Sequence, residues 1–108
     1  MLSKVAGMSP ADASMRLVEW LMYYQNKAEE KLSQELAISN IKEEISSGFI
    51  ANRSLGPTDR KRVEILIRLM ALGHQALEVP IGKDSNSAQT LEGLVNEAQR
   101  LYEEFEKA

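Results

Sequence analysis

Residues 88–107 read AQTLEGLVNEAQRLYEEFEK and carry the clearest pattern in the chain. Their large or apolar side chains recur on positions a, d and e of one heptad register: Ala88, Leu91, Leu94, Val95, Ala98, Leu101, Tyr102 and Phe105. The other positions hold mostly charged and amide side chains. This stripe predicts an amphipathic helix that buries one face along its whole length. We therefore expect an all-α protein in which helices pack on helices.

A second helix is predicted upstream, beginning at Gly56-Pro57-Thr58-Asp59, because proline favours the first helical position. Apolar residues between positions 63 and 77 cover most of its circumference. The polar strip that remains is narrow: Lys61, Glu64, Arg68 and Gln75. A helix that is apolar nearly all round is surrounded by protein. We expect it to be either the central helix of the bundle or part of a subunit interface.

The N-terminal half predicts one long helix that starts at Ser9-Pro10-Ala11-Asp12, where a capping hydroxyl precedes a proline. Strong helix formers continue to about Leu36. The expected inward face consists of Ala11, Met15, Val18, Leu21 and Met22, with Ser14 at its edge.

A short helix is expected next, because Asn40 and Glu43 have the spacing of a capping box. Ile41, Ile45 and Phe49 would point inward, and Gly48 would end this helix. Residues 51–57 are expected to form a loop. An alternative reading joins residues 10–47 into one continuous helix, and the sequence leaves both readings open.

Residues 79–87 form the clearest turn-rich connection, after which Ser85 or Ser87 would cap the last helix. The expected architecture is a small antiparallel helical bundle of three long helices plus one short helix. Residues 1–8 are expected to be a flexible N-terminal tail, and residues 9–108 a single helical-bundle domain.

The composition, 44% hydrophobic and 27% charged over 108 residues, is that of a globular domain with its own core. Cysteine is absent, which excludes disulfides and thiolate sites and suits a reducing cytoplasm. The N-terminus lacks the apolar region of a signal peptide, and no segment is apolar for the length of a membrane span. We therefore expect a cytoplasmic protein without a membrane partner.

Enzymatic signals are weak. One histidine excludes multi-histidine metal sites, and Gly82-Lys83 lacks the first glycine and the hydroxyl residue of a phosphate-binding loop. Adjacent acids such as Glu43-Glu44 lie on polar faces, where solvated carboxylates are the ordinary interpretation. We expect no catalytic residues, no cofactor and no metal.

Three groups of residues are candidates for binding. The first is an aromatic ridge beside the predicted core face of the first helix, formed by Leu17, Trp20, Tyr23 and Tyr24. Large aromatic side chains dominate interface hot spots, so the ridge is a candidate partner-binding surface. The alternative is that a wide core face takes in Trp20 and Tyr24.

The second group is basic and consists of Arg53, Arg60, Lys61 and Arg62. Three of these cations occupy the first turns of a helix, where the macrodipole favours acids, so an anionic partner is one interpretation. The alternative is pairing with the acid-rich last helix of the same molecule. Nucleic-acid phosphate is a further alternative, weakened by the net charge of −3.

The third group is His74 with Met70 and Gly73, in the apolar arc of the helix predicted from residue 57. His74 is interpreted as a core or interface histidine, or as a polar group in a pocket. Gly73 costs helix stability, and the close approach of another helix would explain it.

These features together favour a non-enzymatic protein-binding or regulatory module, such as an inhibitor, an adaptor or an immunity-type antagonist. A homodimer is expected, because three or four short helices would not cover both the helix from residue 57 and the stripe of the last helix. The alternative is a nucleic-acid-associated regulatory protein that uses the basic 53–62 segment.

Overall fold

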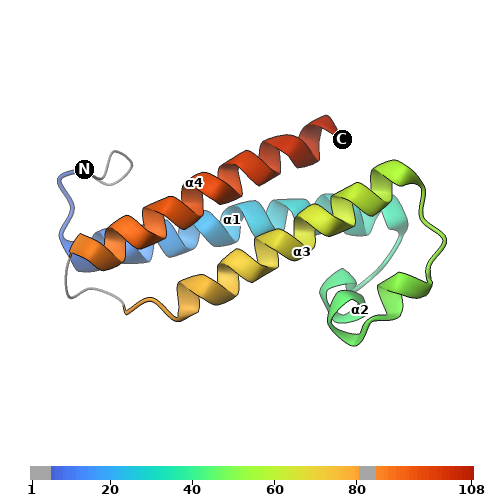
Figure 1. The fold of residues 1–108 in the computed structure, drawn as a ribbon, viewed down its shortest axis with the longest axis horizontal. Helices are drawn as coiled ribbons and strands as arrows, with labels where there is room; N and C mark the ends of the chain where they lie inside the picture. Colours follow the sequence, from blue (N-terminus) through green and yellow to red (C-terminus); the bar gives the residue numbers. More distant parts are fainter. Residues whose placement is uncertain (1–5, 81–84) are drawn as a thin grey trace.

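The computed structural model describes residues 6–80 and 85–108 of the chain. Its elements are α1 (Pro10–Leu36), α2 (Ile41–Ser47), the short 3₁₀ helix η1 (Phe49–Asn52), α3 (Pro57–Leu77) and α4 (Ser85–Lys107) (Figure 1). The described residues contain no β-strand. The predicted all-α architecture of three long helices and one short helix is confirmed. The 3₁₀ helix was not predicted, and it includes the first residues of the expected 51–57 loop.

The three long helices lie side by side, with α1 and α4 running in the same direction and α3 running against both (Figure 1). The short helices α2 and η1 lie beside one end of the bundle, near the start of α3 (Figure 1). The molecule is a rod of 47 × 27 × 17 Å with a radius of gyration of 15.2 Å. A compact domain of this length would have about 13 Å. An elongated bundle leaves more of each helix face to be covered by something else.

The ends of α1 follow local rules. The Ser9 hydroxyl accepts a hydrogen bond of 3.2 Å from the backbone N–H of Asp12, as its capping position predicts. The helix ends after Leu36 because Ala37 adopts a left-handed conformation with φ of 54°. The reading of residues 10–47 as one helix is therefore wrong.

The limits of α2 were predicted correctly. The Asn40 side chain accepts a hydrogen bond of 3.2 Å from the backbone N–H of Glu43. Gly48 ends the helix with φ of 83°, a conformation that glycine adopts at little cost. Ile41 is buried and Ile45 is half-buried, but Phe49 is 64% exposed, so its predicted inward position is wrong.

The stripe of α4 is almost completely buried. Six of its side chains are at most 1% exposed: Ala88, Leu91, Val95, Ala98, Leu101 and Phe105. Leu94 and Tyr102 are partly buried against the same core. The predicted stripe is thus confirmed as core, and it does not need a second copy of the chain to cover it.

The buried face of α1 differs from the predicted face. It consists of Ala13, Ser14, Leu17, Leu21, Gln25, Ala28 and Leu32. Met15 is 55% exposed, while Val18 and Met22 are only partly buried. At 3.6 residues per turn the helix is rotated by roughly 80° from the expected orientation. Both faces are largely apolar, and the chosen one includes a serine and a glutamine.

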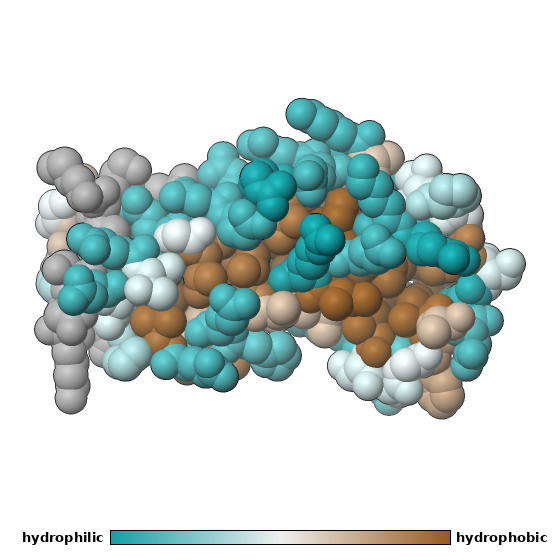
Figure 2. Space-filling model, viewed as in Figure 1, coloured by the Kyte–Doolittle hydropathy of each residue, from teal (hydrophilic) through white to brown (hydrophobic). Residues whose placement is uncertain are grey.

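Within one molecule α3 is not surrounded by protein, so the expectation that it is the central helix of the bundle is wrong. Ile67, Ala71, His74 and Leu77 are exposed on its outer side. Figure 2 shows hydrophobic atoms at the surface where α3 and α4 lie side by side and around the α2 end. The expectation that α3 belongs to a subunit interface stays a prediction.

Two smaller predictions fall at the limits of the described residues. Most of the predicted tail, residues 1–5, lies outside them. Helix α4 begins at Ser85, so Ser87 lies within the helix and does not cap it, and the Ser85 side chain lies outside the described part. Across that described part, no helix combines the length and apolar character that a bilayer span requires.

Candidate functional site

A groove of about 250 Å³ lies between α1 and α3. Its walls are Val18, Met22 and Gln25 from α1, Lys42 from α2, and Met70, Gly73, His74, Ala76 and Leu77 from α3. Most of these side chains are apolar, and we call this feature the α1–α3 groove. The structure therefore brings together in one groove the residues that the sequence grouped as an interface or pocket: Met70, Gly73 and His74.

Gly73 lies where α1 and α3 come closest. A Cβ atom at this position would lie 2.8 Å from the Gln25 Oε1 atom, which is too short for a normal contact. The predicted reason for Gly73, close approach of another helix, is confirmed. Gln25 is only 6% exposed, and its amide forms no hydrogen bond with any residue in the described ranges. The Gln25 amide therefore has a donor and an acceptor to offer to whatever enters the groove that it lines.

The rim of the groove is more open than its floor. Leu77 is 79% exposed, the largest value among the exposed large hydrophobic residues of the described chain. His74 is exposed as well, so its interpretation as a core histidine is wrong. At the other end, the Lys42 Nζ atom lies 3.3 Å from the Glu29 carboxylate, and this ion pair ties α2 to α1. The short helix thus covers only one end of the groove.

The predicted aromatic ridge does not form one surface. Leu17 is completely buried, so its assignment as a partner-binding residue is wrong. Tyr24 is partly buried, and its ring centroid lies 5.6 Å from that of Tyr102 on α4. This outcome matches the alternative reading, in which a wide core face takes in Trp20 and Tyr24. Tyr23 is exposed.

The exposed part of the ridge forms the edge of a separate hollow. Trp20 and Tyr23 line a hollow of about 320 Å³ together with Arg16 and Glu19. All four side chains come from α1. The two aromatic residues therefore stay a candidate partner-binding surface, distinct from the α1–α3 groove.

The basic group is divided by the fold, and Arg62 is used inside the molecule. Its guanidinium lies 2.6 Å from the Glu35 carboxylate of α1. It also donates hydrogen bonds to two backbone carbonyls at the end of α4, 3.3 Å to Phe105 and 2.8 Å to Ala108. A cation at a helix C-terminus is favourable because unpaired carbonyls gather there. The alternative of pairing with the last helix is thus right in location, but the α4 partners are carbonyls instead of acids.

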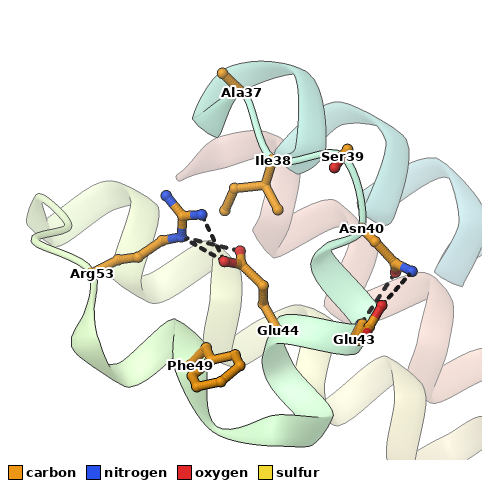
Figure 3. Close-up of a pocket in the computed structure, with 8 residues that line it drawn as sticks. All are labelled: Ala37, Ile38, Ser39, Asn40, Glu43, Glu44, Phe49 and Arg53. Atoms are coloured by element: carbon orange, nitrogen blue, oxygen red, sulfur yellow. Dashed lines mark hydrogen bonds and ion pairs between the residues drawn. The ribbon is translucent and has the colours of Figure 1, made fainter.

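Arg53 is held by α2. Figure 3 shows its guanidinium and the Glu44 carboxylate pointing toward each other, with a shortest N–O distance of 2.6 Å. The hydrogen bonds to Glu44 raise the pKa of Arg53. The pair belongs to a polar hollow of about 320 Å³ lined by Ala37, Ile38, Ser39, Asn40, Glu43, Glu44, Phe49 and Arg53. The Arg53 guanidinium is thus paired with Glu44 within the chain while its side chain stays 45% exposed, and its role in binding an anionic partner stays a prediction.

Two of the four predicted anion-binding residues, Arg60 and Lys61, are exposed and have no ion-pair partner among the described residues. Nucleic-acid binding depends on neutralising several phosphates with Lys and Arg side chains. The patch that remains for the nucleic-acid alternative is therefore two cations on the first turns of α3.

Few of the residues that line the α1–α3 groove carry groups used in catalysis. Its lining residues include no serine, threonine or carboxylate, so His74 has neither a nucleophile nor an orienting acid among them. In the described part of the chain, no three histidine or acidic side chains come close enough to hold a metal ion. The arrangement suits the contact of apolar surfaces better than bond-making chemistry.

Six lining residues of the groove were missed as site residues by the sequence reasoning: Val18, Met22, Gln25, Lys42, Ala76 and Leu77. Val18 and Met22 were assigned to the core because they share a face with Met15 and Leu21. One feature of the sequence could have indicated them. Helix α1 has two apolar faces, and the two other long helices of the bundle can cover only one of them. Gln25 had no signal beyond its spacing from Leu21 and Ala28.

Comparisons of the chain with protein-family models, with curated protein sequences and with solved structures give no match.

Proposed function

We propose that this chain is a non-enzymatic protein-binding module that binds its partner through the α1–α3 groove. An inhibitor, an adaptor or an immunity-type antagonist would act in this way. The observation that carries the proposal is the groove itself, an apolar hollow between two long helices that the short helix α2 covers at one end only. The absence of cysteine supports a reducing cytoplasm as the proposed location.

The chemistry of the walls supports a protein partner. Met22 of α1 and Met70 of α3 both line the groove. Methionine is flexible and polarizable, and it is over-represented on surfaces that bind amphipathic helices. The unpartnered Gln25 amide on the floor can fix the orientation of a partner by hydrogen bonding. A helix that presents an apolar stripe meets these requirements, and a second copy of the chain is one such partner.

Site-specific photocrosslinking in the native host tests the proposal. A benzophenone amino acid replaces Met22 or Met70 in the groove, Tyr23 in the aromatic hollow, or Glu30 on the exposed polar side of α1. We expect a discrete protein adduct from the two groove positions and none from Glu30. An adduct from Tyr23 alone would move the binding surface to the aromatic hollow and overturn the groove. No protein adduct from either groove position would also overturn it.

The nucleic-acid alternative has one observation in its favour, the exposed pair Arg60 and Lys61 on the first turns of α3. It predicts weak, salt-sensitive retardation of nucleic acid that is lost when both cations are neutralised. A mobility-shift titration at low salt measures this, with the Arg60→Gln, Lys61→Gln double variant as the control. No retardation by the native chain would dismiss the alternative.

A further inference from the structure

The outer side of α3 carries a second stripe of mostly apolar residues, which is exposed at Ile67, His74 and Leu77 and half-buried at Met70. Its members, Ile67, Met70, His74 and Leu77, alternate spacings of three and four residues. This alternation is the a and d pattern of a helix that packs against another helix. One turn earlier, Val63 continues the pattern but lies buried. Most of α3 therefore presents a seam suited to a helical partner.

The two ends of this seam carry opposite charges. Arg60 lies near the start of α3, and Glu78 directly follows its last residue. They are separated by about five turns of an α-helix, so they lie on the same side of the seam. Neither forms an ion pair with a described residue. The seam thus has a positive end and a negative end, both available.

We propose that two copies of the chain pair through this seam, with the two α3 helices antiparallel. This inference rests on the proposed function and names its partner. In the register that places Ile67 opposite Met70 of the second copy, Arg60 lies opposite the turn that carries Leu77 and Glu78 of the second copy. The two-fold axis passes between Arg68 and Leu69. Every favourable contact then occurs twice.

A hollow at the far end of the seam fits the most exposed apolar side chain. This hollow, about 330 Å³, is lined by Ile50, Ala51, Arg53, Leu55, Arg60, Val63 and Glu64. The antiparallel register brings Leu77 of the second copy to it. Inserting Leu77 would bury its 79% exposed side chain against Ile50, Leu55 and Val63 of the other copy. At the rim, Arg60 would meet Glu78 of that second copy.

The charges of Arg60 and Glu78 distinguish a parallel from an antiparallel pair of α3 helices. In a parallel pair, a residue on one side of the seam faces the other side of the partner's seam, so Arg60 and Glu78 would not meet. In an antiparallel pair the same sides face each other, which brings Arg60 beside Glu78 of the second copy, and opposite charges at a contact favour that direction. The antiparallel pair also leaves the second long wall of the groove, Val18 and Met22, beside the partner helix.

Sedimentation equilibrium of the full chain tests the proposal. We expect a dimer that dissociates on dilution between about 100 and 1 μM. Leu77→Lys removes two buried leucines per dimer and sets a cation beside Arg60, so we expect dimerisation to weaken at least about a hundredfold. Met15→Lys, which changes an exposed apolar residue of α1 that lines neither the groove nor the aromatic hollow, is the matched control and should leave the dimer unchanged. Circular dichroism verifies that each variant is folded.

A charge-exchange cycle tests the direction and register. Arg60→Glu alone and Glu78→Arg alone each place like charges together, and each should weaken the dimer by about tenfold. The double variant R60E/E78R restores opposite charges and should recover most of that loss. A double variant weaker than both single variants would overturn the antiparallel register.

Two outcomes separate this inference from the proposed function. A chain that stays monomeric at about 100 μM overturns the pairing, as does a dimer that Leu77→Lys leaves intact. If Met22 still crosslinks to a different protein in the host, the groove remains a binding site and only the self-pairing is wrong. If the Met22 and Met70 adducts are absent as well, both are wrong.

Discussion

The stripe of α4 and the face shared by α1 and α3 are both apolar, yet the first is buried and the second is partly exposed to solvent. Leu101 in the α4 stripe is 1% exposed, whereas Leu77 on α3 is 79% exposed. The reason lies in what the chain has available to cover each face. Helices α1 and α3 both pack against α4, whereas α2, a helix of seven residues, contributes only Lys42 to the α1–α3 groove.

The charged residues of the two regions also differ, in how many of them form ion pairs. On α4, Arg100 pairs with both Glu97 and Glu104 within the helix. On α3, Arg60 and Glu78 have no ion pair with a described residue. Several charges of α4 are therefore paired, while the exposed face of α3 carries apolar residues between two charged residues without an ion pair to a described residue. An exposed apolar face rimmed by polar groups is typical of an interaction site.

The largest difference is expected between two leucine truncations. Leu101→Ala removes a fully buried side chain and should lower the free energy of unfolding by about 2 to 5 kcal/mol. Leu77→Ala removes an exposed one and should change the free energy of unfolding of the monomer by less than about 0.5 kcal/mol. Urea denaturation at a concentration where the chain is monomeric measures both. Equal losses would mean that Leu77 is covered within one molecule.

The core of α4 was predictable from the sequence because its polar and apolar positions separate cleanly. The ends of α1 and α2 were predictable for a different reason, since Ser9, Asn40 and Gly48 satisfy backbone groups locally. Neither inference depends on knowing where the other helices lie. Helix ends that are set by local capping, and a buried face that is set by a single apolar stripe, can therefore be predicted from the sequence alone.

The face of α1 was not predictable in the same way, because α1 has two apolar faces. Met15, Val18 and Met22 give a cleaner stripe than the face that is buried, which includes Gln25. Which face turns inward is decided by the approach of α3 at Gly73 and of α4 at Tyr102, and these contacts join residues far apart in the chain. For the same reason the α1–α3 groove was not predicted, because Val18 and Met22 in its wall belong to the apolar face of α1 that is not buried in the core.

Arg62 should have the next largest effect, because it joins three helices. Arg62→Met keeps the aliphatic stem but removes the hydrogen bonds to Glu35, Phe105 and Ala108. We expect a loss of about 2 kcal/mol in the free energy of unfolding, since hydrogen bonds to a charged group are stronger than average. Lys61→Met is the control and should change it by less than about 0.5 kcal/mol. A small loss for Arg62→Met would show that water replaces these contacts.

Replacing the buried polar residue Ser14 of α1 should have a smaller effect on the free energy of unfolding, and it should be stabilising. Ser14 is fully buried, and its hydroxyl forms no hydrogen bond in the structure. Ser14→Ala removes an unsatisfied group and introduces a better helix former, so we expect a gain of about 1 kcal/mol in the free energy of unfolding. Thermal unfolding measures it. A loss of stability would mean that the hydroxyl has a partner in solution.

The smallest effect concerns the polar coat of α4 and its dependence on pH. The hydrogen bonds from Arg100 lower the pKa of Glu97, so the folded state binds fewer protons than the unfolded state. The stability contributed by Glu97 is then fully present above the pKa of glutamate in the unfolded chain. It is lost as the pH falls through the lowered pKa of the folded state.

The matched pair Glu97→Gln and Glu103→Gln isolates this contribution. Glu103 lies on the same helix and is exposed, without an ion pair to a described residue. We expect Glu97→Gln to be slightly less stable than the native chain at pH 7, and this difference should disappear as the pH falls through the lowered pKa of Glu97. Glu103→Gln should show no such pH-dependent difference. Urea midpoints measured across the acid range would decide, because a difference for Glu97→Gln that persists at low pH must come from packing instead of charge.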